Sequence, residues 1–351
     1  MSNASQLELP RLLLDEAYKS LGFLEAKDAL LNAVSHPEPG TDEEKEWLEK
    51  GDWLTLADKV GADKVFFVRN DPVVVFCTMQ SGSDNEQALV DKFRRIWCMA
   101  RPQCLFIALP YGLHVYRLDR LPVRDANSLR KEAEIGLAKS IQEVAEKLHG
   151  FTRERIESGY LVNDKYFGGI DQRADKRLIQ DLKTVRRELL DTGLEAKYAH
   201  ALIGRSIFIR YLEDRGIIDE AYLLQRVVKS NLSWQVIFEQ ETNLLDFAPG
   251  SEKRRYHSIL SDKAFTYALF RQLMNDFNGD MFPDVEEEEK RVNAKHLELI
   301  QGFLLGNTDK YQRPLFLWAY DFEVIPIELI SSIYEEFYHK VNIYRPDRQK
   351  K

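Results

Sequence analysis

The sequence predicts an α+β protein in which a small α/β domain precedes an all-helical domain. Short apolar runs of strand-like composition, such as KVFFVR (64–69) and VVVFCTM (73–79), are confined to the first 150 residues. From about residue 150 onward, strand signals nearly vanish and apolar residues recur at helical spacing instead. We therefore place the α/β domain at residues 1–150 and the helical domain at residues 151–351, with the boundary between 150 and 172.

The α/β domain is expected to begin with an amphipathic helix at residues 11–33, which ends before the breaker Pro37-Glu38-Pro39-Gly40. An acidic helix is predicted at about 42–50. Residues 64–79 are predicted to form a β-hairpin, because the turn signal Asn70-Asp71-Pro72 separates two apolar runs.

A helix at about 84–99 leads to a second predicted hairpin at residues 104–118, which turns at Pro110-Tyr111-Gly112. His114 alternates with apolar neighbours there, which indicates a residue on the strand surface rather than a catalytic base. A long helix at about 126–148 is expected to close the domain.

In the helical domain, residues 172–192 carry the clearest pattern. Leucine and valine side chains spaced by four, three and four positions form one apolar stripe: Leu178, Leu182, Val185 and Leu189. Further helices are predicted at 195–215, 219–229, 261–276, 291–304 and 326–340. The acidic run at 286–289 is expected to be solvated.

The composition is that of an ordinary globular protein, with 351 residues, 44% of them hydrophobic and 30% charged. No apolar run approaches the roughly 18 residues of a membrane helix, and the start lacks a signal-peptide pattern, so we expect a cytoplasmic protein with no membrane partner. The three cysteines lack zinc-binding spacing, and we expect no metal site. A formal net charge of −8 still allows a local basic strip.

The segment SIFIRYLEDRGIID (206–219) crowds four charges into an apolar helix: Arg210, Glu213, Asp214 and Arg215. Buried charge is costly unless it is paired. Arg210 and Asp214 are four positions apart and can pair along the helix surface. We interpret the four charges as fixing the end of this helix against its neighbours, and the alternative is direct contact with a ligand.

Four blocks of sequence together resemble a known family. They are RRIWCMARPQCLFIALPYGLHVYRL (94–118), ALIGRSIFIRYLEDRGII (201–218), LFRQLMNDFNGDMFP (269–283) and LWAYDFEVIPIELISSIYEEFY (317–338). The chain resembles, over residues 60–340, the region that precedes the catalytic domain in type IIG restriction–modification enzymes and related N6-adenine DNA methyltransferases of bacterial phage defence.

The resemblance implies a nuclease-like N-terminal piece and a helical piece that leads into the methyltransferase and helps to engage DNA. We expect the motif residues Asn278, Asp280 and Asp321, like the four charges at 210–215, to be structural.

The chain lacks the methyltransferase itself. That domain needs a glycine-rich loop after a strand and an Asn/Asp-Pro-Pro-aromatic turn that grips a flipped adenine. Gly168-Gly169 follows no apolar strand, and Asp71-Pro72 is followed by two valines. We therefore expect no cofactor in this chain, and S-adenosylmethionine and Mg²⁺ only in a missing or partner domain.

Nuclease activity would need an aspartate on one strand and an acid-x-Lys pair on the next, which together hold Mg²⁺ and orient water. Asp63 and Asp71 are the candidates for the first position. The second strand offers Cys77-Thr78-Met79, with neither acid nor lysine. We therefore expect a degenerate nuclease fold kept for scaffolding or DNA contact.

Candidate DNA contacts lie opposite the apolar stripe of the 172–192 helix, where Lys176, Lys183 and Arg187 share one line and could follow a phosphate backbone. Asp181 and Glu188 are expected to flank this line and weaken its field, and a plain solvated face is the alternative. Arg94 and Arg95 either face DNA or cap the sheet, which the sequence leaves open.

The expected function is a non-catalytic module that positions double-stranded DNA and docks a methyltransferase domain or subunit supplied elsewhere. Two alternatives remain: a stand-alone metal-dependent DNA endonuclease, and a protein-interaction scaffold without DNA contact. The missing acid-x-Lys pair argues against the first, and the salt dependence of DNA binding tests the second.

Overall fold

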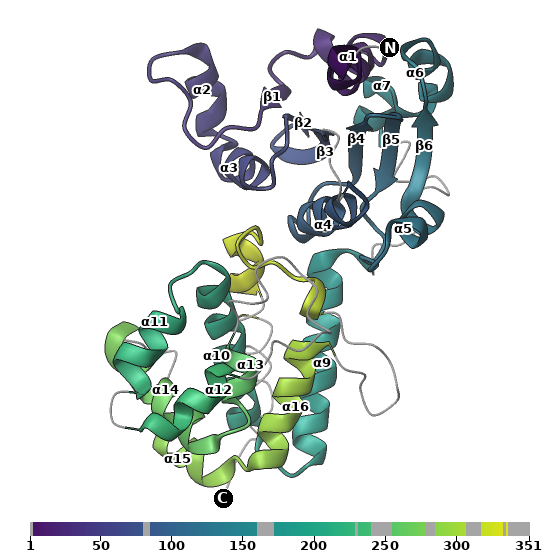
Figure 1. The fold of residues 1–351 in the computed structure, drawn as a ribbon. Coiled ribbons are helices and arrows are strands. Elements are labelled where there is room, and N and C mark those ends of the chain that lie inside the picture. Colours follow the sequence, from purple (N-terminus) through teal and green to yellow (C-terminus); the bar gives the residue numbers. More distant parts are fainter. Residues whose placement is uncertain are drawn as a thin grey trace, which may run out of the picture. The chain divides into compact units, whose positions relative to one another are not determined.

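The computed structural model describes residues 3–79, 85–159, 172–228, 231–239, 255–277, 285–306, 317–332 and 335. It confirms the α+β class: a six-stranded mixed sheet with helices is followed by a mostly helical region (Figure 1). The chain forms two compact units. The first comprises Met1–Lys176 with Val324–Pro326, and the second comprises Arg177–Glu323 with Ile327–Lys351.

The first unit is built on one sheet whose strands lie side by side in chain order. They are β1 (Leu30–Asn32), β2 (Lys64–Val68), β3 (Asp71–Thr78), β4 (Cys104–Leu109), β5 (Gly112–Arg117) and β6 (Glu134–Ala138). All neighbours are antiparallel except β3 and β4, which run parallel because α4 (Asn85–Cys98) crosses between them. Both predicted hairpins, β2–β3 and β4–β5, are confirmed.

Six further helices of the described residues belong to this unit. They are α1 (Asn3–Ser20), α2 (Asp42–Leu48), α3 (Gly51–Lys59), α5 (Ala126–Ala133), α6 (Ile141–Lys147) and α7 (Arg153–Glu157), with 3-10 turns at Phe23–Glu25 and His149–Phe151. The predicted acidic helix corresponds to α2, and α3 directly after it was not predicted.

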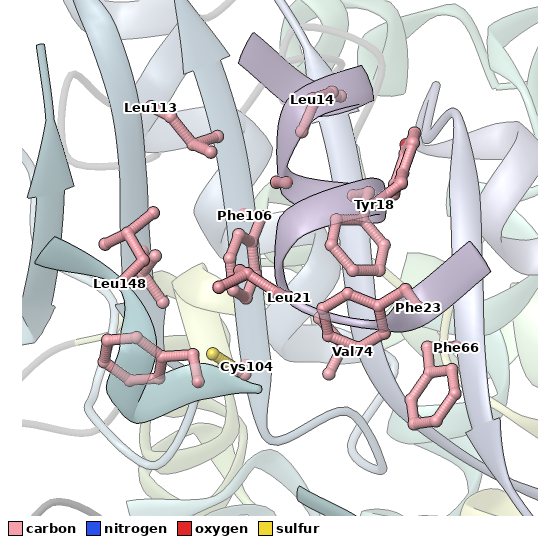
Figure 2. Close-up of a cluster of buried hydrophobic side chains, with 14 of the residues drawn as sticks. Leu14, Tyr18, Leu21, Phe23, Phe66, Val74, Cys104, Phe106, Leu113 and Leu148 are labelled. Carbon is pink, nitrogen blue, oxygen red and sulfur yellow. The ribbon is translucent and has the colours of Figure 1, made fainter. Parts of the chain in front are cut away.

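Aromatic side chains fill the core between the sheet and α1 (Figure 2). The Phe23 ring lies edge-on to Phe66 and to Phe76, with ring centroids 5.1 Å apart in both pairs. The Tyr18 ring of α1 also lies edge-on to Phe76, at 5.0 Å. Edge-to-face pairs of this kind add about 0.5–1.5 kcal/mol beyond the area they bury, so this cluster anchors α1 to the strands.

The opposite face of the sheet is covered by α4. Leu113 and Val115 of β5 belong to the core beneath α1, whereas Tyr116 contacts Phe93 of α4, with ring centroids 6.1 Å apart. Successive side chains of a strand point to opposite faces, so β5 is buried on both sides. This accounts for the complete burial of His114, which corrects its expected place on the strand surface.

Two long predicted helices are wrong because each contains a short edge strand. The helix expected at 11–33 ends at Ser20, since Gly22 adopts a left-handed φ of 81°, and β1 follows. The helix expected at 126–148 is interrupted by β6, which pairs with β5. The sheet therefore gains a strand at each edge.

The described residues of the second unit form helices and turns, and no strand. Its elements are α10 (Ala196–Asp214), α11 (Glu220–Tyr222), a π-helical turn (Leu223–Val228), a 3-10 turn (Leu232–Gln235), α12 (Val236–Glu239), α13 (Tyr256–Ile259), α14 (Lys263–Phe277), α15 (Val285–Arg291), α16 (Ala294–Leu305) and a 3-10 turn (Leu317–Ala319). The preceding α9 (Ala174–Asp191) begins in the first unit and continues in the second.

Most helices predicted for this region are confirmed. The elements α9, α10, α14 and α16 occupy the predicted ranges to within three residues. The apolar stripe of α9 is fully buried, as the spacing requires. The acidic run at 286–289 lies in α15, where Glu286 and Glu287 are exposed as predicted, but Glu288 is completely buried.

Candidate functional sites

The two carboxylates considered for a cation site lie at opposite ends of the first hairpin. Asp71 begins β3 opposite Val68, whereas Asp63 precedes β2 and its amide donates to the Phe76 carbonyl at 2.8 Å. The five residues of β2 lie between them, a span of roughly 16 Å at the rise of a strand. Asp63 and Asp71 therefore do not share one cation.

Asp63 lies near the strand position that carries Cys77. Burial raises the pKa of the Cys77 thiol to about 12; the charge of Lys92 opposes this shift and that of Asp63 adds to it. The pKa of the Tyr18 hydroxyl is raised by burial and then by the Asp63 charge. The strand position next to Asp63 is therefore occupied by a thiol that stays protonated at neutral pH.

No cluster of three or more metal-binding side chains exists within the ranges that the structure describes. A hard cation such as Mg²⁺ takes oxygen ligands and one or two carboxylates in most protein sites. On the neighbouring strand, Asp63 has a protonated thiol near it rather than a second acid.

Basic side chains of α4 close the end of α3, which the sequence did not reveal. The Lys92 ammonium donates to the carbonyls of Val60 at 2.6 Å and Gly61 at 3.1 Å, and the Arg95 guanidinium donates to the Lys59 carbonyl at 3.1 Å. The last carbonyls of a helix lack intrahelical partners. Arg95 therefore caps a helix rather than the sheet.

Arg94 is not a surface residue. It is 1% exposed and lies 3.9 Å from the Asp91 carboxylate one turn earlier in α4. A side chain buried to this extent cannot reach a DNA phosphate, which excludes the DNA-facing role considered for Arg94.

The exposed face of α9 carries the predicted line of positive charge. Lys176, Lys183 and Arg187 are all exposed, and eleven residues of helix place the outer two about 16 Å apart. The acids expected to flank this line are buried instead: Asp181 pairs with Arg177 at 3.0 Å, and Glu188 is 8% exposed. Two other acids of α9 are accessible: Asp175 is half-buried, and Asp191, one turn after Arg187, is exposed.

The charges at the end of α10 contact segments that are distant in the sequence. Asp214 pairs with Arg210 at 3.5 Å, and both side chains are at most 4% exposed, so the pair is not on the surface. The Asp214 carboxylate also accepts the Phe322 amide at 2.9 Å. The Arg215 guanidinium donates to the Glu323 carbonyl at 3.5 Å and lies over the Tyr211 ring.

A buried ion pair deeper in the second unit was not predicted. The Arg205 guanidinium lies 2.5 Å from the Glu288 carboxylate, with both side chains 0% exposed, and the Tyr267 hydroxyl donates to the same carboxylate at 3.0 Å. Glu288 stands among three other glutamates at 286–289, so the sequence alone does not show which of the four is buried.

The remaining motif residues are Asp321, Asn278 and Asp280. The Asp321 carboxylate accepts the Glu323 amide at 3.0 Å, which closes a turn. Asn278 and Asp280 lie outside the described residues.

Comparison with known proteins adds no further constraint: no protein-family model, curated protein or solved structure matches the chain. Among the described residues, no helix is both long enough and apolar enough to cross a membrane.

Proposed function

We propose that the chain is a non-catalytic, cytoplasmic module of a DNA restriction–modification or phage-defence adenine methyltransferase system. In this role it positions double-stranded DNA and docks a methyltransferase domain or subunit supplied elsewhere. The docking partner is suggested by the resemblance of the sequence blocks alone.

The line of cations on α9 carries the proposal for DNA. Its three side chains are exposed, while Asp181 and Glu188 of the same helix are buried, which favours a positive strip on a protein of net charge −8. Lysine and arginine on such a strip contact phosphates without reading base sequence. Binding through α9 would therefore position DNA and leave sequence recognition to another domain.

The absence of cleavage is supported by the first hairpin. Asp63 has the buried Cys77 thiol near it, and Asp71 lies at the far end of β2. Neither arrangement provides the paired oxygen ligands that hold a hard cation for metal-assisted hydrolysis.

The direct test measures binding of a 30-base-pair duplex by the full chain in gel shifts at low and moderate salt. The double charge reversal Lys183→Glu/Arg187→Glu is expected to weaken binding at least tenfold. Its matched control is Arg291→Glu/Lys295→Glu, which reverses two exposed charges of the same unit and should retain most of the affinity.

Equal losses in the two variants would show that net charge alone acts, and no binding by the wild type at low salt would favour a protein-interaction scaffold. Supercoiled plasmid incubated with Mg²⁺ or Mn²⁺ tests the endonuclease alternative. We expect no nicking. Nicking that disappears in Asp63→Ala or Asp71→Ala would establish cleavage and overturn the non-catalytic role.

A further inference from the structure

The carboxylate of Glu213 joins α10 to the start of α13. The residue is 7% exposed, and its Oε1 accepts the backbone amides of Arg255 and Tyr256, each at 2.8 Å. Amides at the beginning of a helix have no acceptor within that helix. One buried side chain therefore satisfies two backbone donors of a segment 42 and 43 positions away.

The arginines near Glu213 are each also paired with another carboxylate. On α10, Arg210 is shared with Asp214, whose own charge opposes that of Glu213. On α13, the Arg255 guanidinium lies 3.6 Å from Glu220 of α11. The next groups are the Tyr256 hydroxyl, bonded to Ser206 at 2.9 Å, and the Arg205–Glu288 pair of α10 and α15.

Burial raises the pKa of Glu213 from its ordinary 4.5 to about 7, although Arg210 and the two amides favour the charged form. When the contact between α10 and α13 is closed, Glu213 is buried and keeps its proton up to about pH 7. When the contact opens, the hydrated carboxyl has its ordinary pKa of 4.5 and releases the proton. The closed contact is therefore most stable at acid pH, and it loses stability as pH rises from 4.5 through 7.

We propose that Glu213 makes the contact between α10 and α13 proton-dependent: the contact is firm while the carboxyl is protonated and opens more often once it is ionised. The protonated group keeps a carbonyl oxygen that accepts both amides. Ionisation adds the cost of a buried charge, which opening relieves by hydration.

Hydrogen exchange of the full chain tests this. The protection of the Arg255 and Tyr256 amides, corrected for intrinsic exchange, should fall about tenfold between pH 6 and pH 8, the change that linkage gives for a carboxyl titrating near 7 when closed and near 4.5 when open. In Glu213→Gln, which keeps the acceptor oxygen, protection should not change with pH. Glu298→Gln, an exposed carboxylate of α16, should behave as the wild type.

Constant protection in the wild type would overturn the proposal, and so would an equal fall in Glu213→Gln. The amides of β4 serve as the internal reference, and a parallel fall there would mean global loss of stability rather than opening of one contact. If Glu213→Gln does not fold, the wild-type series with this reference still decides the question.

Discussion

Charged side chains on the helices of this protein differ sharply in how far they are buried. Arg205, Arg210 and Glu288 are buried, while Lys176 and Lys183 are exposed. The exposed cations of α9 could be predicted because they lie opposite a regular apolar stripe. The Arg205–Glu288 pair could not, because its partners are 83 positions apart and each looks like a surface residue in its own helix.

The buried pair gives a prediction at the residue level. Replacing Arg205 with Met leaves Glu288 as an uncompensated buried charge, which costs about 3–5 kcal/mol of stability. Adding Glu288→Gln removes that charge and keeps an acceptor for the Tyr267 hydroxyl. The double variant should therefore recover much of the loss in urea unfolding at pH 7. A double variant no more stable than Arg205→Met would show that the cost comes from packing.

Among the elements, long and regular segments could be predicted and short edge strands could not. The two hairpins have apolar runs on both sides of a turn signal, and α9 has a four-residue stripe. By contrast, β1 has three residues and β6 has five, of which four are half-buried. Strands this short gain their stability from pairing with a neighbour already in the sheet, which a local pattern cannot reveal.

The close approach of β6 explains why a glycine, Gly112, begins β5. A Cβ at this position would lie 2.8 Å from the Ala138 carbonyl of β6, which is backbone and cannot move aside easily. We expect Gly112→Ala to lower the free energy of unfolding by about 1–3 kcal/mol. Gly150→Ala is the matched control, because a Cβ there meets nothing within 4 Å, and its effect should stay within about 0.5 kcal/mol. Equal stabilities in urea would contradict the close approach of β5 and β6.

For the whole molecule, the proposed function raises the question of how a protein of net charge −8 would bind a polyanion. Long-range repulsion slows the approach of DNA, but salt screens it beyond roughly 10 Å. Under the proposed function, short-range contacts with phosphates would decide the affinity, and these would depend on the local strip of α9 rather than on the total charge. Affinity and its salt dependence should therefore both respond to substitutions in the α9 strip, and much less to an equal change of net charge elsewhere.

The contribution of the α9 strip can be measured as the slope of log K against log salt concentration. Each phosphate contact contributes about 0.9 to the decrease of log K with log salt concentration on duplex DNA. Replacing Lys183 and Arg187 with Gln removes two such contacts, so the slope should fall by about 1.8 when anisotropy titrations are run between 50 and 200 mM salt. Arg291→Gln/Lys295→Gln changes the net charge equally, and its slope should match that of the wild type. If the α9 variant keeps the wild-type slope while losing affinity, its side chains act by repulsion at a distance, and the phosphate contacts lie on another surface of the protein.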